Sequence, residues 1–118
     1  MLTATPVATS TIAASPTAEI TATPNPRAVF TRYLQANSLL SSGKYDQAIP
    51  QFEVVIRIHP NFAQAYHGRG LAYYKDGQPE MALADFTKAI ELKPNYADAH
   101  RNRGVLYTNR GNLTLGIQ

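Results

Sequence analysis

The sequence contains no cysteine, which excludes disulfide bonds and thiolate metal sites. This absence leaves the compartment open, because many proteins on both sides of a membrane lack cysteine. Although 44% of the 118 residues are hydrophobic, no run approaches the roughly 20 apolar residues of a membrane-spanning helix. A secretory signal is also not expected, since Pro6, Thr9 and Ser10 interrupt the apolar groups of the N-terminus. We therefore expect no membrane segment in this chain, and its localisation is either cytoplasmic or extracytoplasmic.

Charge is nearly absent from residues 1–26, where Glu19 is the single charged residue. Threonine, alanine and proline dominate this segment, and such a composition cannot bury enough apolar surface to offset the entropy of ordering it. We predict a disordered linker over residues 1–26 and a folded domain over residues 27–118. Stalks rich in threonine and proline are frequent outside the cytoplasm, which is one indication of a secreted or anchored protein.

From about residue 29 the sequence repeats with a period of 34 residues. The shift aligns Phe52 with Phe86 and Pro60 with Pro94, and the stretches HPNFAQAY (59–66) and KPNYADAH (93–100) keep the same order of residue types. A fixed period without insertions indicates one structural unit copied along the chain. The predicted units are about 29–62, 63–96 and a truncated 97–118.

Each unit is predicted to contain two helices. Apolar residues fall at helical spacing over 48–56 and over 82–90, and a proline follows each of these segments. Asparagine can cap the first helix of each unit by accepting a backbone hydrogen bond, and glycine can end it in a left-handed conformation. The predicted caps are Asn25, Asn61 and Asn95, and the predicted ends are Gly43, Gly77 and Gly111.

The repeating region resembles the tetratricopeptide repeat (TPR) family, whose unit has 34 residues. The second unit has the spaced residues of the family at Tyr66, Gly70, Tyr73, Ala82, Phe86, Ala89 and Pro94. The resemblance implies an all-α fold, a right-handed α-solenoid of antiparallel helix pairs with about two and a half repeats. It also implies that Gly70 and Gly104 allow the helices of a unit to pack closely, and that Tyr73 and Tyr107 fill the space between units.

Arg69 and Arg103 depart from the family pattern, because they stand where a buried leucine is usual. A buried charge without a partner is costly, and Asp85 is the nearest matching position on a second helix. We predict that Arg69 or Arg103 forms hydrogen bonds with Asp85. The alternative is that these side chains extend to solvent. In the first unit Gln35 and Gln51 hold the matching places, which suggests a paired position.

The resemblance further implies a function, because the first helices of such repeats line a concave face that binds peptides. The candidate groove residues carried over from the family are Tyr33, Asn37, His67, Tyr74, Lys75, Arg101, Asn102 and Asn109. Seven basic residues oppose two acidic ones across the three first helices, a balance of +5. This balance favours an acidic segment or a C-terminal carboxylate as ligand. The alternative is that these charges are solvated or structurally paired.

Some family members hold the terminal carboxylate of a peptide in a clamp of five residues. The same positions hold Tyr33, Asn37, Gly68, Asp98 and Asn102 here, and only one of the five matches. We therefore exclude this type of chaperone-tail binding.

Other chemistries have little basis in the sequence. His59, His67 and His100 lack the spacing that places two imidazoles on one helix face, so no metal site and no cofactor are expected. Serine and threonine are concentrated in the N-terminal segment, where no fixed geometry activates them, so the chain is not expected to be an enzyme. RNA binding by helical repeats is a minor alternative, disfavoured by the 34-residue spacing and by the lack of a continuous basic stripe.

The sequence thus predicts a non-catalytic protein–protein interaction module that docks a peptide on its concave face. The alternative is a regulatory or scaffolding arm of a larger enzyme, or of a secreted or anchored protein, of which this chain is a fragment. The third unit is short, and Leu113, Leu115 and Ile117 have little to pack against. Self-association through this truncated C-terminal repeat is therefore a further expectation.

Overall fold

The computed structural model describes residues 25–115, and their side chains as far as Gly111. Over this range the chain forms five α-helices and no strand: α2 (Pro26–Ser41), α3 (Tyr45–Ile58), α4 (Ala63–Lys75), α5 (Pro79–Leu92) and α6 (Ala97–Leu115). The all-α prediction is confirmed. A linker was predicted for residues 1–26, and residues 1–24 of it lie outside the described part of the chain.

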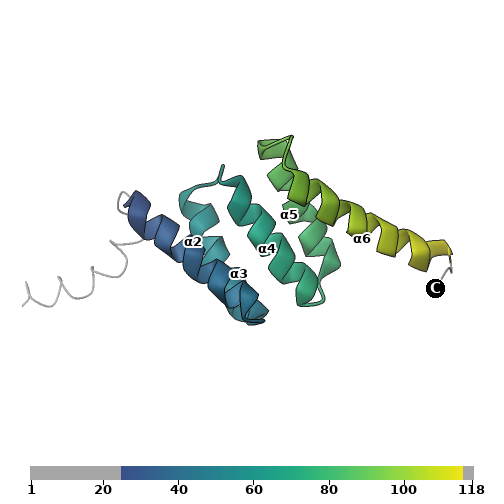
Figure 1. Ribbon diagram of the computed structural model, residues 1–118, viewed down its shortest axis with the longest axis horizontal. Helices are drawn as coiled ribbons and strands as arrows, with labels where there is room; N and C mark the ends of the chain where they lie inside the picture. The colour runs from purple at the N-terminus through teal and green to yellow at the C-terminus, as the bar shows by residue number, and fades with distance from the viewer. Residues whose placement is uncertain (1–24, 116–118) are drawn as a thin grey trace, which may run out of the picture.

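The helices are arranged as successive hairpins, α2 with α3 and α4 with α5, followed by α6. In Figure 1, α2, α4 and α6 form a front layer, and α3 and α5 lie behind it. Helix α4 contacts both α3 and α2, and α6 contacts α5. Equivalent hairpins therefore stack as the layers of an α-solenoid, as the repeat period predicts.

Two turns at Gly43 and Gly77 connect the helices of the complete hairpins. Both glycines have a left-handed backbone, with φ of 81° and 83°, a conformation that glycine adopts without strain. The amide of Lys44 donates to the carbonyl of Leu39 at 2.9 Å, and the amide of Gln78 donates to the carbonyl of Tyr73 at 2.8 Å. The predicted helix ends at these two glycines are confirmed, with the same hydrogen bonds one period apart.

The third predicted helix end, at Gly111, is wrong, because α6 continues through this residue to Leu115. At Gly43 and Gly77 the chain leaves the helix because a following helix packs back against the first one. In the described part of the third unit no helix packs back on α6, so nothing offsets the hydrogen bonds that a turn at Gly111 would break. Glycine inside a helix costs only about 1 kcal/mol relative to alanine.

The predicted caps have mixed outcomes. The side chain of Asn25 accepts from the amide of Arg27 at 2.9 Å, and Pro26 begins α2, as predicted. Asn61 is not the cap of α4, because this helix begins at Ala63 and its N-cap Phe62 makes no side-chain capping bond. Helix α6 likewise begins at Ala97, two residues after Asn95. Backbone turns replace the side-chain caps here: the amide of Phe62 donates to the carbonyl of His59 at 3.1 Å.

Pro50 lies inside α3, four residues after Asp46. Proline has no amide hydrogen, so the carbonyl of Asp46 receives no helical hydrogen bond from it. The side chain of Pro50 is exposed. The missing bond is close to the start of the helix, where the interruption leaves the rest of α3 intact.

Phe52, Val55 and Phe86 are the largest fully buried side chains of the core. Glycines on α4 make room for the two rings: a Cβ added at Gly68 would lie 2.5 Å from Phe52, and one added at Gly70 would lie 2.6 Å from Phe86. The role predicted for Gly70 is thus observed, and Gly68 does the same for the preceding unit. Each glycine allows a phenylalanine of a second helix to lie directly against the α4 backbone.

The matching roles predicted for Gly104 and Tyr107 are wrong. A Cβ added at Gly104 would meet no atom within 4 Å. Tyr107 is 50% exposed, whereas Tyr73 is 8% exposed at the same position of the second unit. The reason is the same for both residues: among the described residues, no second helix lies against this side of α6.

Candidate functional site

Arg69 forms the predicted pair with Asp85 across the α4–α5 hairpin. Its Nε donates to Oδ2 and its Nη2 donates to Oδ1, both at 2.8 Å. Asp85 is the one buried charged residue among those described. The hydrogen bonds to Asp85 raise the pKa of Arg69, and burial raises the pKa of the Asp85 carboxyl against the opposing effect of Arg69. This pair occupies the interior of the hairpin, so it is structural and not part of an open site.

Arg103 does not reach Asp85. Its Nη1 donates instead to the hydroxyl of Thr87 at 3.3 Å, and its guanidinium lies 5.8 Å from the ring of Tyr107. In the first unit Gln51 accepts a hydrogen bond from Arg32 at 2.7 Å, and Gln35 is exposed. The suggested pairing of Gln35 with Gln51 is therefore not observed.

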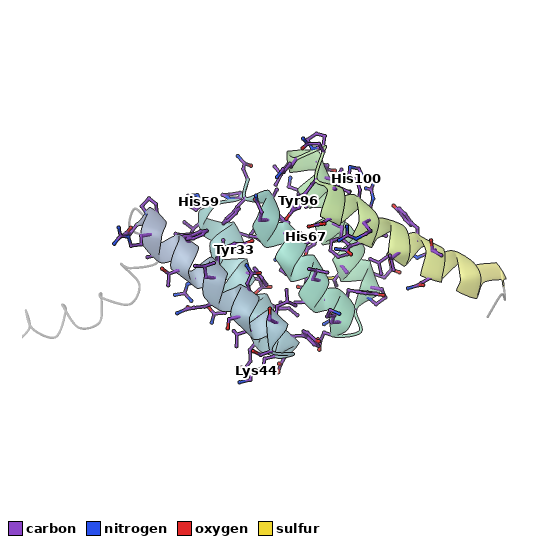
Figure 2. The ribbon with its side chains drawn as sticks, viewed as in Figure 1. Tyr33, Lys44, His59, His67, Tyr96 and His100 are labelled. Carbon is purple, nitrogen blue, oxygen red and sulfur yellow. The ribbon has the colours of Figure 1, made fainter. Side chains whose placement is uncertain are left out.

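Two of the candidate groove residues, Tyr33 and His67, are partly covered by aromatic side chains from the loop that follows their unit. The ring of Phe62 lies 4.8 Å from that of Tyr33, and the ring of Tyr96 lies 5.0 Å from that of His67. Figure 2 shows Tyr33, His67 and Tyr96 in the upper part of the view, away from Lys44 at the α2–α3 turn. Burial raises the pKa of Tyr96 to about 12. One loop aromatic thus covers the same position of successive first helices.

His67 also joins α4 to α6. The amide nitrogen of Asn102 donates to His67 Nε2 at 2.9 Å, which requires this ring nitrogen to be unprotonated. Burial lowers the pKa of His67, Asp98 acts in the opposite direction, and Arg101 adds to the lowering. Arg101, the equivalent of His67 in the third unit, is exposed and pairs with Asp98 at 2.9 Å. His67, Arg101 and Asn102 therefore form one group in the N-terminal halves of α4 and α6, while Tyr33 lies on α2 against Phe62.

A second group lies at the C-terminal half of α4, where the Nδ2 of Asn109 donates to the hydroxyl of Tyr74 at 3.5 Å. A pocket of about 370 Å³ opens beside these two residues. It is lined by Tyr74, Gly77, Pro79, Glu80, Leu106, Asn109 and Arg110. Its surface is mostly apolar, with the ion pair between Arg110 and Glu80 at its rim. Such a pocket can accept an apolar side chain of a ligand.

The remaining candidates are Lys75 and Asn37. Lys75 is exposed at the end of α4 and forms no ion pair with any residue between 25 and 111. Asn37 lies half-buried on α2. The structure thus brings the other candidates into two groups on α4 and α6 and leaves Tyr33, Asn37 and Lys75 outside both.

Sequence reasoning missed Phe62, Tyr96 and Leu106 as parts of this surface. The signal for the first two was present, because an aromatic residue follows Pro-Asn at the same place in each loop. It indicated a repeated unit but not which side chain the aromatic ring would cover. Leu106 had no separate signal, because an apolar residue at its position is also expected in the core.

The basic charge of the first helices is partly neutralised by local pairs. Arg69, Arg101 and Arg110 each pair with a carboxylate, whereas the exposed Lys75 has no such partner among the described residues. Between residues 25 and 111, no three histidine or carboxylate side chains lie together in a way that would hold a metal ion. Among the helices described, none is both long enough and apolar enough to cross a membrane.

Family models match the chain in three overlapping segments. A TPR repeat model matches residues 36–77, and tetratricopeptide repeat models match residues 63–96 and 86–118. The match over residues 63–96 coincides with the second predicted unit, and the other two matches extend into the first and third units. Among curated proteins none matches this chain.

Several solved structures are similar to the chain. MamA 41-end from Desulfovibrio magneticus RS-1 is 30% identical with a TM-score of 0.69, over 75% of this chain and 50% of that one. The MamA RS-1 ArsTM double mutant is 30% identical with a TM-score of 0.68, over 73% and 48%. The TPR2AB domain of yeast Sti1, in a pHSP90 complex, is 24% identical with a TM-score of 0.70, over 91% and 42%. This chain spans about half the length of these structures or less.

The stacked hairpins, the spaced residues and the family matches agree with one another. TPR domains are typically non-catalytic, and the repeats support a role as a protein–protein interaction module in general. The chain belongs to the tetratricopeptide repeat family.

Proposed function

We propose that this chain docks a peptide segment of a partner protein on the face formed by α2, α4 and α6. The observation that carries the proposal is the pocket beside Tyr74, Leu106 and Asn109, because it is mostly apolar and borders two residues of the predicted groove. An apolar side chain of the ligand enters this pocket. The amide of Asn109 and the hydroxyl of Tyr74 then supply hydrogen bonds to the ligand backbone.

The positive charge of Lys75, the sequence neighbour of the pocket residue Tyr74, favours an acidic residue in the ligand. Lys75 follows Tyr74 directly and is exposed, and it has no carboxylate partner among residues 25–111. A single exposed lysine contributes more to the rate of association and to specificity than to affinity. The ligand we propose therefore combines one apolar anchor with a nearby acidic side chain.

The loop aromatics that lie on Tyr33 and His67 restrict the surface available to a ligand. Phe62 and Tyr96 lie against these two residues. A ligand that approaches this part of the surface therefore contacts Phe62 and Tyr96 rather than Tyr33 and His67. Most of the direct contact then falls on the C-terminal half of α4 and on α6. The yeast Sti1 domain that forms a complex with pHSP90 shares this fold, which is consistent with a protein or peptide partner for a domain of this shape.

A peptide-display selection on the whole chain tests the proposal. Selected peptides are labelled, and their dissociation constants are measured by fluorescence anisotropy for wild type, Tyr74→Ala, Lys75→Glu and Lys88→Glu. We expect Tyr74→Ala to weaken binding about tenfold or more, as removal of a buried aromatic anchor does. Lys75→Glu is expected to weaken binding mainly at low salt.

Lys88→Glu is the matched control, because it makes the same charge change on α5, where Lys88 is exposed. It is expected to leave the affinity unchanged. The proposal would be contradicted if the dissociation constants of the selected peptides were unchanged in both Tyr74→Ala and Lys75→Glu. RNA is the competing ligand class: saturable RNA binding that survives about 0.2 M salt, without any selected peptide, would also contradict it.

A further inference from the structure

The pocket beside Tyr74 lies between the α4–α5 turn and α6, and the first unit has an equivalent place between the α2–α3 turn and α4. The repeat period of 34 residues aligns Pro79, which lines the pocket, with Tyr45. Each of these residues is the first of its helix, Pro79 in α5 and Tyr45 in α3. The same structural position therefore has a proline in one unit and an aromatic ring in the other.

The ring of Tyr45 occupies the place in the first unit that corresponds to the pocket. It packs against the core cluster that includes Ala72, and Ala72 aligns with the pocket residue Leu106. Its hydroxyl lies 4.0 Å from a Cβ added at the turn glycine Gly43, and Gly43 aligns with the pocket residue Gly77. In the second unit the shorter proline leaves a pocket of about 370 Å³, even though Leu106 is larger than Ala72.

A complete following unit does not cover this place. In the first unit both helices of the next unit, α4 and α5, are present, and Tyr45 is still only partly buried. This side of the hairpin therefore faces solvent even where a full hairpin follows it. The pocket in the second unit thus follows from the short side chain of Pro79.

We propose that the anchor of the docked peptide is an aromatic side chain, which occupies the pocket as the Tyr45 ring occupies the equivalent place of the first unit. This inference rests on the docking function proposed above and specifies its ligand. The ligand is a segment of a partner protein in which a phenylalanine or tyrosine is accompanied by the acidic residue that Lys75 favours.

The chemistry of the pocket selects an aromatic ring over an aliphatic side chain. Arg110 lines the pocket, and its guanidinium pairs with Glu80 at the rim. A guanidinium close to the face of a ring gains a cation–π attraction that an aliphatic side chain does not provide. The chain already contains such a contact, because the guanidinium of Arg69 lies 5.7 Å from the centre of the Tyr73 ring.

The sequence argues against this chain itself as the source of the ring. Residues 1–24 contain no aromatic residue. Among the described residues, Phe30 and Tyr107 are the aromatic side chains that are about half exposed, at 53% and 50%. Each has an arginine and no acidic residue within three positions along the chain. A second copy would therefore bring positive charge toward Lys75, whereas an acidic partner segment is attracted to it.

Two peptide-display libraries test the inference, one with phenylalanine or tyrosine fixed at the central position and one with leucine, isoleucine or valine fixed there. Both are selected on the whole chain, and dissociation constants are measured by fluorescence anisotropy. We expect binders from the aromatic library whose affinity falls about tenfold when the central ring is replaced by leucine. Replacement of phenylalanine by cyclohexylalanine keeps the size but removes the aromatic face, and it is expected to weaken binding about threefold.

Variants of the chain locate the binding. Pro79→Tyr fills the pocket with the side chain that the first unit has at this position, and it is expected to abolish binding. The variant is expected to fold, because Tyr45 begins α3 at the same place, and circular dichroism checks this. Pro50→Tyr is the matched control, since it makes the same exchange at an exposed position of α3. It is expected to leave the dissociation constants unchanged.

The outcomes separate this inference from the docking function. If peptides from the aliphatic library bind as tightly as those from the aromatic one and are lost in Pro79→Tyr, the aromatic anchor is overturned and the docking function stands. If no selected peptide responds to Pro79→Tyr, both are overturned. A dimer in sedimentation experiments that dissociates in Pro79→Tyr would make a second copy the occupant and would also overturn the inference.

Discussion

The second and third units share an arginine, a glycine and a tyrosine at the same places, yet these residues have different surroundings. Arg69 is hydrogen-bonded to a buried carboxylate, and Arg103 donates to a threonine hydroxyl. Gly70 lies under a phenylalanine ring, and Gly104 has no neighbour within 4 Å of an added Cβ. The difference teaches that a position in a repeat protein has its structural role only when the adjacent helix is present. Stability in such arrays is a sum of nearest-neighbour terms.

The largest difference in stability between the two units is expected when the buried Phe86 ring of the second unit is removed. Phe86→Ala is expected to lower the free energy of unfolding by about 4 kcal/mol, because it leaves a cavity in a fully buried site. Tyr107→Ala, on the exposed side of α6, is expected to change it by less than about 0.5 kcal/mol. Urea denaturation followed by circular dichroism measures both. Equal losses would show that Tyr107 has a packing partner.

The next largest difference in stability is expected for the arginines, because only Arg69 pairs with a buried carboxylate. Arg69→Met leaves Asp85 buried without its partner and is expected to cost about 3 kcal/mol, whereas Arg103→Met is expected to cost about 0.5 kcal/mol or less. The double variant Arg69→Met/Asp85→Leu should recover most of the loss, because it removes both charges. A double variant as unstable as Arg69→Met alone would mean that packing, and not the unpaired carboxylate, determines the cost.

Substitution of the two equivalent glycines is expected to change the stability in opposite directions. Gly70→Ala places a Cβ 2.6 Å from the Phe86 ring, and it is expected to destabilise the chain by about 1–2 kcal/mol, since overpacking exceeds the gain in helix propensity. Gly104→Ala meets no atom and is expected to stabilise it by about 0.5–1 kcal/mol. Thermal denaturation of the two variants side by side is sufficient. A stabilising Gly70→Ala would contradict the close approach of α5 to α4.

The smallest expected effect is a dependence of the free energy of unfolding on pH. Burial lowers the pKa of His67 in the folded chain, so the unfolded chain binds more protons as the pH falls below the ordinary histidine value of 6.5. Stability is therefore highest above that value and is lost as the pH falls through it. His67→Gln should flatten the dependence of the free energy of unfolding on pH between 7 and 5. His59→Gln, at an exposed loop position, is the control and should leave the slope unchanged.

The sequence allowed much of the fold to be predicted, because hairpin turns and buried stripes are local properties of each unit. Gly43 and Gly77 end helices where the period places them. The pairing of Arg69 with Asp85 was also predictable, since a charge at a buried position requires a partner. These features repeat, and repetition makes a weak local signal specific.

Other features were not predictable, because they depend on neighbours that the pattern does not specify. Gly111 matches Gly77 in sequence but lies inside α6. Asn61 matches a capping pattern, but the backbone turn at Phe62 starts α4 without it. The cover over His67 depends on the direction of the Tyr96 side chain, and sequence spacing does not report such directions.

The proline inside α3 affects how the first hairpin opens. Residues 45–49 are followed by Pro50, which supplies no amide, so the carbonyl of Asp46 in the first turn of α3 accepts no hydrogen bond from the residue four positions on. Amide hydrogens in this turn should exchange with deuterium sooner than those of the α5 start, through local opening that leaves Phe52 buried. We therefore expect limited proteolysis to cut the α2–α3 connection before the α4–α5 connection.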